Sequence, residues 1–269
     1  MAVTLAIHEP PELTAELPVL VFIHGMLASR HQWTGHFEAL HPHAQPVCVE
    51  LWGHGDSPAP EEPDQYAIQT IIGQIEQWRQ SRRISRLIIC GHSFGAGLAM
   101  RYVLTYPDKV SGLIFMNSLS ALSEPTLFTD NPTRKARMEA LLTGGVEALR
   151  RLPFHPRHAL RLDADLRARL VREADRVDPI AVVKLNLLTG PSLSALSELD
   201  QIECPTLLVN GRFEKRFQPM RERALAEIRH CEVVDLDAGH AVNLEQPVAF
   251  NHAVTQFVQN LDMTKGDTN

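Results

Sequence analysis

The sequence predicts an α/β fold in which helices cover both faces of a mostly parallel, doubly wound sheet. Short apolar runs recur along the chain, and their length is typical of strands that are buried on both faces. Stretches with helical character separate most of these runs, and such alternation produces parallel strands joined by crossovers of one hand. Between residues 119 and 199 the alternation stops, which indicates an inserted helical segment.

Six apolar runs are expected to form strands, and five other stretches are expected to form helices. The predicted strands are Val19–Ile23, Val47–Val49, Leu87–Cys90, Leu113–Met116, Thr206–Val209 and Glu232–Leu236. The predicted helices are His31–Leu40, Ala67–Gln80, Phe94–Tyr106, Pro219–Ile228 and Gln246–Leu261.

The chain length bounds the domain organisation. A chain of 269 residues lies near the upper limit for one hydrophobic core, which is about 250–300 residues. We therefore expect one domain over residues 1–269, made of a core (1–118 and 200–269) and a helical lid (about 119–199). Gly144, Gly145 and six prolines should divide the lid into several short helices.

The lid is slightly basic and partly apolar. It carries 12 Lys and Arg against 10 Asp and Glu, a net charge of +2, whereas the rest of the chain carries −8. Its arginines either form solvated helix faces or, in one or two cases, face an anionic substrate. Its apolar residues either line a pocket or pack the lid onto the core. They are Leu141, Leu142, Leu149, Leu152, Phe154, Leu187 and Leu188.

Composition argues against several classes of protein. With 44% hydrophobic residues the chain can form a core, and a net charge of −6 does not suit a nucleic-acid binder. No window reaches the roughly 18 apolar residues of a membrane span, and the N-terminus lacks the basic start of a secretory signal. The four cysteines are far apart, so we expect buried free thiols in a reducing cytoplasm, without disulfides or zinc. They are Cys48, Cys90, Cys204 and Cys231.

The strongest motif is Gly91-His92-Ser93-Phe94-Gly95, which follows a predicted strand and opens a predicted helix. A G-x-S-x-G pattern in that context forms a sharp turn that exposes the serine hydroxyl. Glycines allow the two chain segments to approach closely. Ser93 is therefore the candidate nucleophile, and the Phe94 backbone N–H, at the start of the helix, can stabilise an oxyanion.

A second motif, His24-Gly25-Met26, directly follows the first predicted strand. We expect the Met26 backbone N–H to be the second oxyanion donor. His24 should support the turn rather than react. His24, Gly25 and Trp52 are weaker candidates for substrate contact. Trp52 belongs to the loop Leu51–Ser57, which we expect to give structural support.

A serine hydroxyl needs a base within hydrogen-bond reach, and histidine is the usual one. His240 follows the last predicted strand in the run Asp237-Ala238-Gly239-His240, so it is the candidate base. His92 should point away from Ser93 in the turn. The reserve candidates are His24, His54, His155 and His158.

A carboxylate should orient the base, in the chain order serine, acid, histidine. Glu214 follows the strand Thr206–Val209 and is the candidate acid. Its basic neighbours leave a surface ion pair as the alternative, and Asp237 is the reserve. The end of Leu113–Met116, where the acid can also lie, has no carboxylate before Glu124.

Together these motifs resemble the α/β-hydrolase superfamily, in its lid-containing branch with a Ser-His-acid triad. The matching segments are HGM at 24–26, ELWGHGDS at 50–57, GHSFG at 91–95, VNGRFE at 209–214 and AGH at 238–240. The resemblance implies an eight-stranded sheet with the lid inserted after the sixth strand, although the segment before Val19 leaves little room for leading strands. A serine nucleophile argues against the dehalogenase and epoxide-hydrolase branches. Glu214 stands where Asp is commoner in the family.

The resemblance implies a carboxylesterase-like serine hydrolase that acts on a small ester, lactone, thioester or C–C-linked carbonyl compound. No metal ion or organic cofactor is needed, and the expected partner is a small molecule, not a nucleic acid or a membrane. The chain could be a monomer or a homodimer. Two other functions stay open. One is a lyase resembling MenH-type synthases, in which the triad abstracts a proton, and the other is a hydrolase-like receptor that binds a ligand with little turnover.

Overall fold

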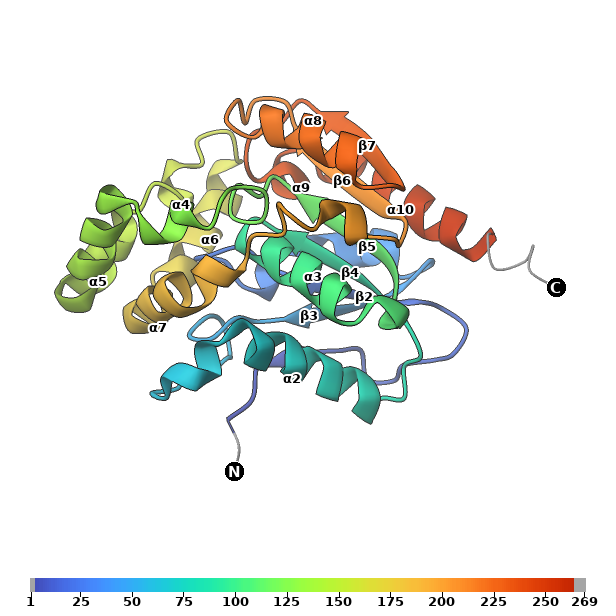
Figure 1. Ribbon diagram of the computed structural model, residues 1–269, viewed down its shortest axis with the longest axis horizontal. Helices are drawn as coiled ribbons and strands as arrows, with labels where there is room; N and C mark the ends of the chain where they lie inside the picture. The colour runs from blue at the N-terminus through green and yellow to red at the C-terminus, as the bar shows by residue number, and fades with distance from the viewer. Residues whose placement is uncertain (1–2, 264–269) are drawn as a thin grey trace.

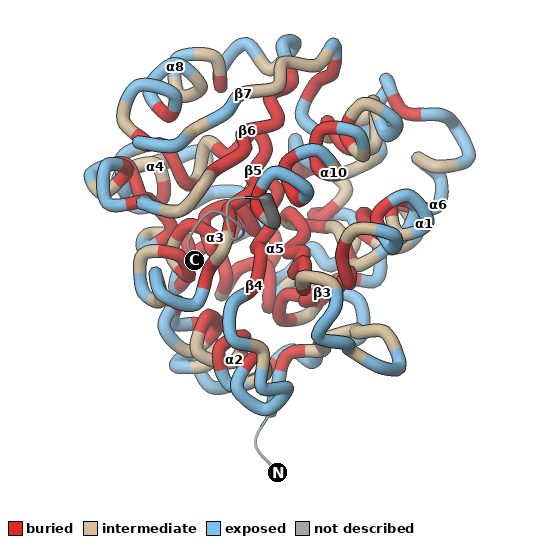
Figure 2. The backbone as a smooth tube through the Cα atoms, turned by 90° about the vertical axis from the view of Figure 1, so that its right-hand side faces the viewer, coloured by how far each residue is buried: buried red, intermediate tan, exposed pale blue. Residues whose placement is uncertain are grey.

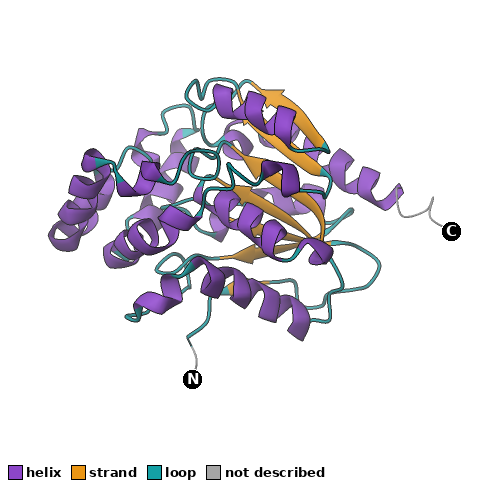
Figure 3. Ribbon diagram, viewed as in Figure 1, coloured by secondary structure: helices purple, strands orange, loops and turns teal. Residues whose placement is uncertain are grey.

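The computed structural model describes residues 3–263 and has a central sheet between layers of helices (Figures 1 and 3). Residues 1–2 and 264–269 of the expected domain lie outside the described residues. The strands are β1 (Ile7–His8), β2 (Val19–Ile23), β3 (Gln45–Val49), β4 (Leu87–His92), β5 (Val110–Met116), β6 (Thr206–Gly211) and β7 (Cys231–Leu236). Their order is β1-β3-β2-β4-β5-β6-β7, and all pairs are parallel except β1 with β3. This confirms the predicted α/β class.

The described residues form seven strands, not the eight that the family resemblance implied. Only β1 precedes β2, and its two residues pair antiparallel with Val49 and Cys48 at one edge of the sheet. Each of the six predicted runs lies within one of the strands β2 to β7. The helical insertion therefore follows the fifth strand of this sheet, where we expected it after a sixth.

The strands are apolar on both sides because helices cover both faces. Successive residues of β2 alternate between the two cores: Val21 belongs to the core that also contains residues of helices α2, α3 and α8, and Phe22 belongs to the core that contains residues of α1 and α10. The helices are α1 (Phe37–Leu40), α2 (Ile68–Ser81), α3 (Phe94–Thr105), α8 (Gln218–Glu227), α9 (Val242–Glu245) and α10 (Pro247–Met263). In Figure 2 the buried backbone follows the central strands, whereas the edge strand β7 is mostly half-buried.

Four of the five predicted helices are present, and the fifth is broken. His31–Leu40 was expected to be one helix, but it contains parts of two 3₁₀ turns, Arg30–Gln32 and Thr34–His36, followed by the single turn α1. Thr34 and Gly35 have low helix propensity, and short stretches of a few residues often form 3₁₀ turns. The segment therefore behaves as a structured loop beside the end of β2.

The stretch between β5 and β6 is helical, as predicted, and we call residues 119–199 the helical insertion. Its α-helices are α4 (Thr126–Thr129), α5 (Pro132–Arg150), α6 (Ala164–Ala174) and α7 (Pro179–Lys184), and a π-helical turn (Leu185–Thr189) follows. Pro132 and Pro179 stand at helix starts, where proline is tolerated. Gly145 has φ +53° and ψ −142°, which are not helical angles, so two helices meet at a kink within the range of α5, and the Gly-Gly pair divides them as the sequence predicted.

The helical insertion has a small core of its own, separate from the two cores of the sheet. Leu141, Leu149 and Leu152 are buried in it, together with Leu27 from the loop after β2. These three leucines therefore pack within the core of the insertion. The other apolar candidates are exposed: Leu142, Phe154, Leu187 and Leu188.

All four cysteines are free, but burial was predicted correctly for only two of them. Cys48 and Cys90 are buried in the sheet, whereas Cys204 and Cys231 lie at its edge and are half-buried. Burial raises the pKa of the Cys204 thiol to about 11. Within the described residues, no helix combines the length and the apolar character that crossing a bilayer demands.

Candidate active site

Ser93 lies on a strained turn between β4 and α3. Its backbone has φ +54° and ψ −113°, a conformation that is rare outside glycine. A Cβ atom at Gly91 would overlap the backbone of Gly95 and Ala96, and one at Gly95 would overlap the Ile23 carbonyl. The two glycines of the motif are therefore required for close approach, as the sequence predicted.

Neighbouring strand ends hold the strained turn in place. The Ser93 N–H donates to the Met116 carbonyl at 3.2 Å. The Ser118 hydroxyl donates to the Ser93 carbonyl at 2.5 Å, and the Ser120 hydroxyl does so at 3.3 Å. The residues after β5 thus fix the backbone of the candidate nucleophile. Sequence reasoning found no carboxylate at this strand end and missed this contribution.

His240 and Glu214 form a pair across two loops. The His240 Nδ1 donates to the Glu214 Oε2 at 2.7 Å, which leaves Nε2 free to act as a base. Burial acts to raise the pKa of the Glu214 carboxyl, but the hydrogen bond from His240 and the charge of Arg216 outweigh it and lower that pKa. Glu214 is therefore a stable anion beside the imidazole.

The loop after β6 positions Glu214. The Glu214 N–H donates to the Gly211 carbonyl at 3.1 Å, and the Gln218 side chain donates to the Glu214 carbonyl at 3.0 Å. Gln218 is also bound to Asn210, the buried residue before Gly211. The reserve acid Asp237 instead faces solvent and pairs with the exposed Arg212 at 2.9 Å.

The His92 ring lies beside His240, a contact that the sequence did not indicate. The two ring centroids are 4.7 Å apart, and the His92 Nε2 donates to the His240 carbonyl at 2.8 Å. Burial lowers the pKa of His92 to about 3, so the ring is neutral near pH 7. The residue next to Ser93 thus also holds the loop that carries His240.

The loop after β2 approaches Ser93 closely. A Cβ atom at Gly25 would lie 3.4 Å from the Ser93 Cβ and 2.9 Å from the His92 Nδ1. Glycine is therefore needed at this position, and the half-buried Met26 follows it. Leu27 has φ +60°, and its N–H donates to the His54 Nε2 at 3.1 Å. This contact fixes the turn that presents Met26.

His24 and His54 brace this loop as neutral rings. Each Nδ1 donates to a nearby carbonyl, Gly25 for His24 and Trp52 for His54. The His24 Nε2 accepts from the Leu51 N–H at 3.1 Å. Burial lowers both pKa values, that of His54 to about 3. All ring nitrogens are thus engaged, so neither histidine is available as a base.

The remaining candidates lie away from this group. Trp52 is fully buried, and its indole N–H donates to the Gln65 carbonyl at 2.8 Å. We therefore do not retain Trp52 or His24 as substrate contacts. His155 and His158 belong to the helical insertion, where His155 lies 3.4 Å from Asp175 and His158 contacts the Arg150 carbonyl.

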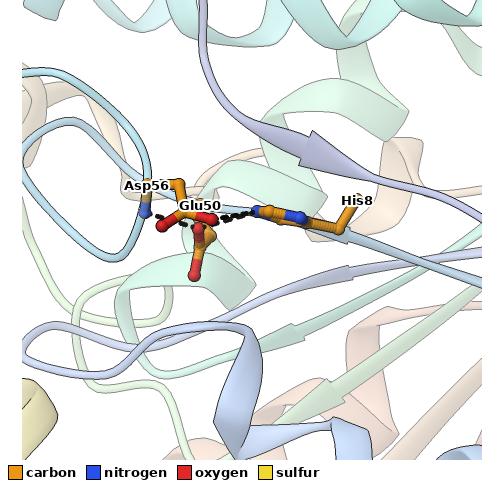
Figure 4. A group of neighbouring side chains, drawn as sticks. All are labelled: His8, Glu50 and Asp56. Carbon is orange, nitrogen blue, oxygen red and sulfur yellow. Dashed lines mark hydrogen bonds and ion pairs between the residues drawn. The ribbon is translucent and has the colours of Figure 1, made fainter.

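Figure 4 shows a separate group, His8, Glu50 and Asp56, whose ligand atoms lie within 4.8 Å of one another. The guanidinium of Arg30 occupies the centre of this group, 3.1 Å from Glu50, 2.6 Å from Asp56 and 3.1 Å from His8. Burial acts to raise the pKa of Glu50, but the backbone N–H groups of Asp56 and Arg30 outweigh it and lower that pKa. The group is an internal ion pair that supports the loop Leu51–Ser57.

A cavity of about 570 Å³ opens between α6, the 3₁₀ turns after β2 and helix α9. Leu166, Leu170 and Leu244 give it an apolar wall, and Arg169 and Arg172 lie on its rim. Ser93, Glu214 and His240 do not line it. Asn243, three residues after His240 in the chain, contributes to its lining.

The chain is similar in sequence and in fold to several known proteins. A Bacillus subtilis protein assigned as a 2-succinyl-6-hydroxy-2,4-cyclohexadiene-1-carboxylate synthase is 25% identical over 250 residues, 90% of each chain. Escherichia coli RutD, assigned as a carbamate hydrolase, is 26% identical over 269 residues and covers 93% of this chain and 89% of its own. The structure of MenH from S. aureus superposes with a TM-score of 0.83 at 20% identity, over 97% of this chain and all of that one.

The first two relatives share about a quarter of their residues with this chain over most of its length, and the third shares its fold. The sequence model of the protein family described as "alpha/beta hydrolase fold" matches residues 18–247, a range that includes Ser93, Glu214 and His240. The chain therefore belongs to the α/β-hydrolase fold family.

Proposed function

We propose that this protein is a serine hydrolase of a small ester, lactone, thioester or C–C-linked carbonyl compound, with Ser93, His240 and Glu214 as its catalytic triad. The observation that carries the proposal is the 2.7 Å hydrogen bond from His240 to the half-buried anion Glu214. His240 lies on a loop that His92, the neighbour of Ser93, holds by a second hydrogen bond. The His240 side chain is 42% exposed and that of Glu214 is 19% exposed, so it is the support of the His240 loop that separates this pair from a free surface ion pair.

In the first half of the reaction Ser93 forms an acyl-enzyme. His240 Nε2 takes the proton of the Ser93 hydroxyl as the oxygen attacks the carbonyl carbon. The backbone N–H groups of Met26 and Phe94 hold the oxyanion of the tetrahedral intermediate. The bond to the leaving group then breaks, and His240 gives its proton to that group.

In the second half water releases the acyl group. His240 takes a proton from water, the hydroxide attacks the acyl carbon, and the Ser93 oxygen leaves and recovers its proton from His240. Glu214 stays ionised throughout and stabilises the imidazolium. Because every proton moves between Ser93, His240, substrate and water, this chemistry calls for no metal ion or organic cofactor.

A second candidate function is a lyase that uses the same residues to abstract a proton. The Bacillus subtilis relative favours it, since it carries a synthase assignment and aligns over 90% of both chains. In this reaction His240 and Ser93 would act as a base toward a carbon acid, and no acyl-enzyme would form. The two functions therefore differ in whether Ser93 carries a covalent intermediate.

Fluorophosphonate labelling read by intact mass tests the proposed triad. We expect one adduct on the wild type and none on Ser93→Ala. Ser111→Ala is a matched control, because Ser111 lies on β5 and bonds only the Leu87 carbonyl, and it should label normally. A folded wild type that takes no label would contradict the proposal and favour a ligand receptor.

A panel of aryl esters, lactones and thioesters then separates the two enzymatic functions. Turnover of 4-nitrophenyl acetate that is lost in Ser93→Ala supports the hydrolase. A labelled Ser93 with no turnover across the whole panel would contradict the hydrolase and favour the lyase.

A further inference from the structure

Asn117 is a buried polar residue to which the sequence assigned no function. It is the first residue after β5 and is only 1% exposed. Its φ of +26° lies in the left-handed region, which asparagine tolerates better than most residues with a side chain. The strand end that lacks the acid therefore carries an inward amide with a special backbone conformation.

The Asn117 amide joins the two loops that carry Glu214 and His240. Its Nδ2 donates to the Gly239 carbonyl at 2.8 Å, one residue before His240. Its Oδ1 accepts from the Gly211 N–H at 3.1 Å, three residues before Glu214. The ends of β5, β6 and β7 are thus connected through a single side chain.

The space around this amide is closed. A Cβ atom at Gly211 would lie 2.8 Å from the Asn117 Nδ2 and would overlap the Gly239 carbonyl. The two loops therefore touch at Gly211 and Gly239, and Asn117 fills the remaining gap. The residues around the amide leave no room for a larger side chain.

The chemistry of this position requires an amide. One partner of Asn117 is a carbonyl and needs a donor, and the other is an N–H and needs an acceptor. Asparagine offers both on one short, neutral side chain, whereas aspartate offers only acceptors at neutral pH. An unpaired buried N–H or carbonyl is costly, so both bonds should persist.

We propose that Asn117 is a positioning residue for the triad, which sets the separation of Glu214 and His240 by fixing Gly211 and Gly239. This inference rests on the proposed function. Asn117 acts through the two loops and does not touch the reacting atoms. Without it the loops can separate, the 2.7 Å hydrogen bond between Glu214 and His240 loosens, and the imidazole loses its orientation.

The effect has a signature in the steady-state kinetics. The hydrogen bond between His240 and Glu214 orients the imidazole of the base. When that bond loosens, the imidazole loses its orientation, so kcat should fall while KM stays nearly unchanged.

The test compares Asn117→Gly and Asn117→Asp with the wild type, Ser93→Ala and Tyr102→Phe. Glycine keeps the left-handed backbone available and removes both hydrogen bonds. Aspartate keeps an acceptor for Gly211 but sets a carboxylate against the Gly239 carbonyl. Tyr102→Phe is the control, since Tyr102 is buried and bonds Glu76 at 2.7 Å on the helices remote from the triad.

Each variant is assayed for the rate of fluorophosphonate labelling and for kcat and KM on 4-nitrophenyl acetate. We expect both Asn117 variants to lower the labelling rate and kcat by about 10- to 100-fold, with KM changed by less than about 3-fold. Tyr102→Phe should lower only Tm.

Three outcomes are distinct. If Ser93→Ala loses its label and Asn117→Gly keeps the wild-type labelling rate and kcat, the proposed function stands and the inference is overturned. If the wild type takes no label, both are overturned. Should Asn117→Gly not fold, Asn117→Asp decides, because a folded Asn117→Asp protein with a normal labelling rate and kcat also overturns the inference.

Discussion

The carboxyl ends of the strands, which carry the candidate triad, and the helical insertion are each stabilised in a different way. At the strand ends, hydrogen bonds from buried side chains join the loops of separate strands, as Asn117 and His92 illustrate. The insertion has an apolar core of its own, and it also packs on the core of the sheet through apolar side chains such as Phe128, Leu185 and Leu193. Its Lys184 donates to the carbonyls of Pro60 and Glu61. The difference indicates that directional hydrogen bonds set the geometry at the strand ends, whereas mainly apolar packing positions the insertion.

The sharpest way to test this comparison is to remove the nucleophile. Ser93→Ala should lower kcat by about 10⁴-fold or more, because the acyl-enzyme can no longer form. Ester turnover and intact mass measure the effect, and circular dichroism checks the fold. An active Ser93→Ala would show that the residues at the strand ends do not carry out the reaction.

Glu214→Gln should have the next largest effect, a loss of about 10³- to 10⁴-fold in kcat, because the amide cannot stabilise the imidazolium. Asp237→Asn is the matched control and should change kcat by less than about 3-fold, since its partner Arg212 is exposed. Equal effects of the two substitutions in the same assay would show that Glu214 is not the acid of the triad.

A core variant should affect stability without affecting catalysis. Glu76 is a buried carboxylate whose pKa is lowered to about 2, and the hydrogen bond from Arg79 is the largest cause. Hydrogen bonds from Tyr102 and Gln80 also lower this pKa, whereas burial acts to raise it. The stabilisation from this lowered pKa is complete above about pH 4.5 and is lost as the pH falls toward 2.

Glu76→Gln should therefore lower Tm at pH 7 and flatten the dependence of Tm on pH between about 4.5 and 2. Thermal melts over this range, together with kcat at pH 7, provide the measurement. A variant with an unchanged acid dependence of Tm would show that this ion pair contributes nothing to stability.

The smallest expected effect lies at the contact between the insertion and the acid loop. The Arg161 guanidinium lies 4.3 Å from the centre of the exposed Phe213 ring. Such a contact contributes about 0.5–1 kcal/mol at exposed sites, so Arg161→Ala should change KM by about 2- to 5-fold and leave kcat unchanged. A large fall in kcat would instead place the insertion within the catalytic machinery.

The sequence predicted the fold well because its signals are local. Runs such as Val19–Ile23 are apolar throughout, and both faces of the sheet are covered. His31–Leu40 was predicted as one helix because its broken character depends on how Gly35 and the 3₁₀ turns fit against the end of β2. Strand β1 was not among the predicted strands because it has only two residues.

For the candidate site, the motifs pointed to residues but not to the side chains that hold them. Ser93, Glu214 and His240 follow strand ends, and Glu214 and His240 meet in the structure. Asn117 gave no signal, because an asparagine after a strand is common and its partners are more than 90 residues away. The contact of His92 with the loop of His240 also gave no signal, because it joins residues 148 positions apart.

The two histidines that brace the loop after β2 have an electrostatic consequence. His24 and His54 accept backbone N–H groups as neutral rings, where a carboxylate could have accepted them as well. A carboxylate there would place a negative charge beside the position where the proposed mechanism develops another, and the two would repel in a medium of low dielectric constant. Glu50, the nearby acid, is already paired with Arg30. The loop after β2 is thus held in place without adding net charge that would oppose the proposed reaction.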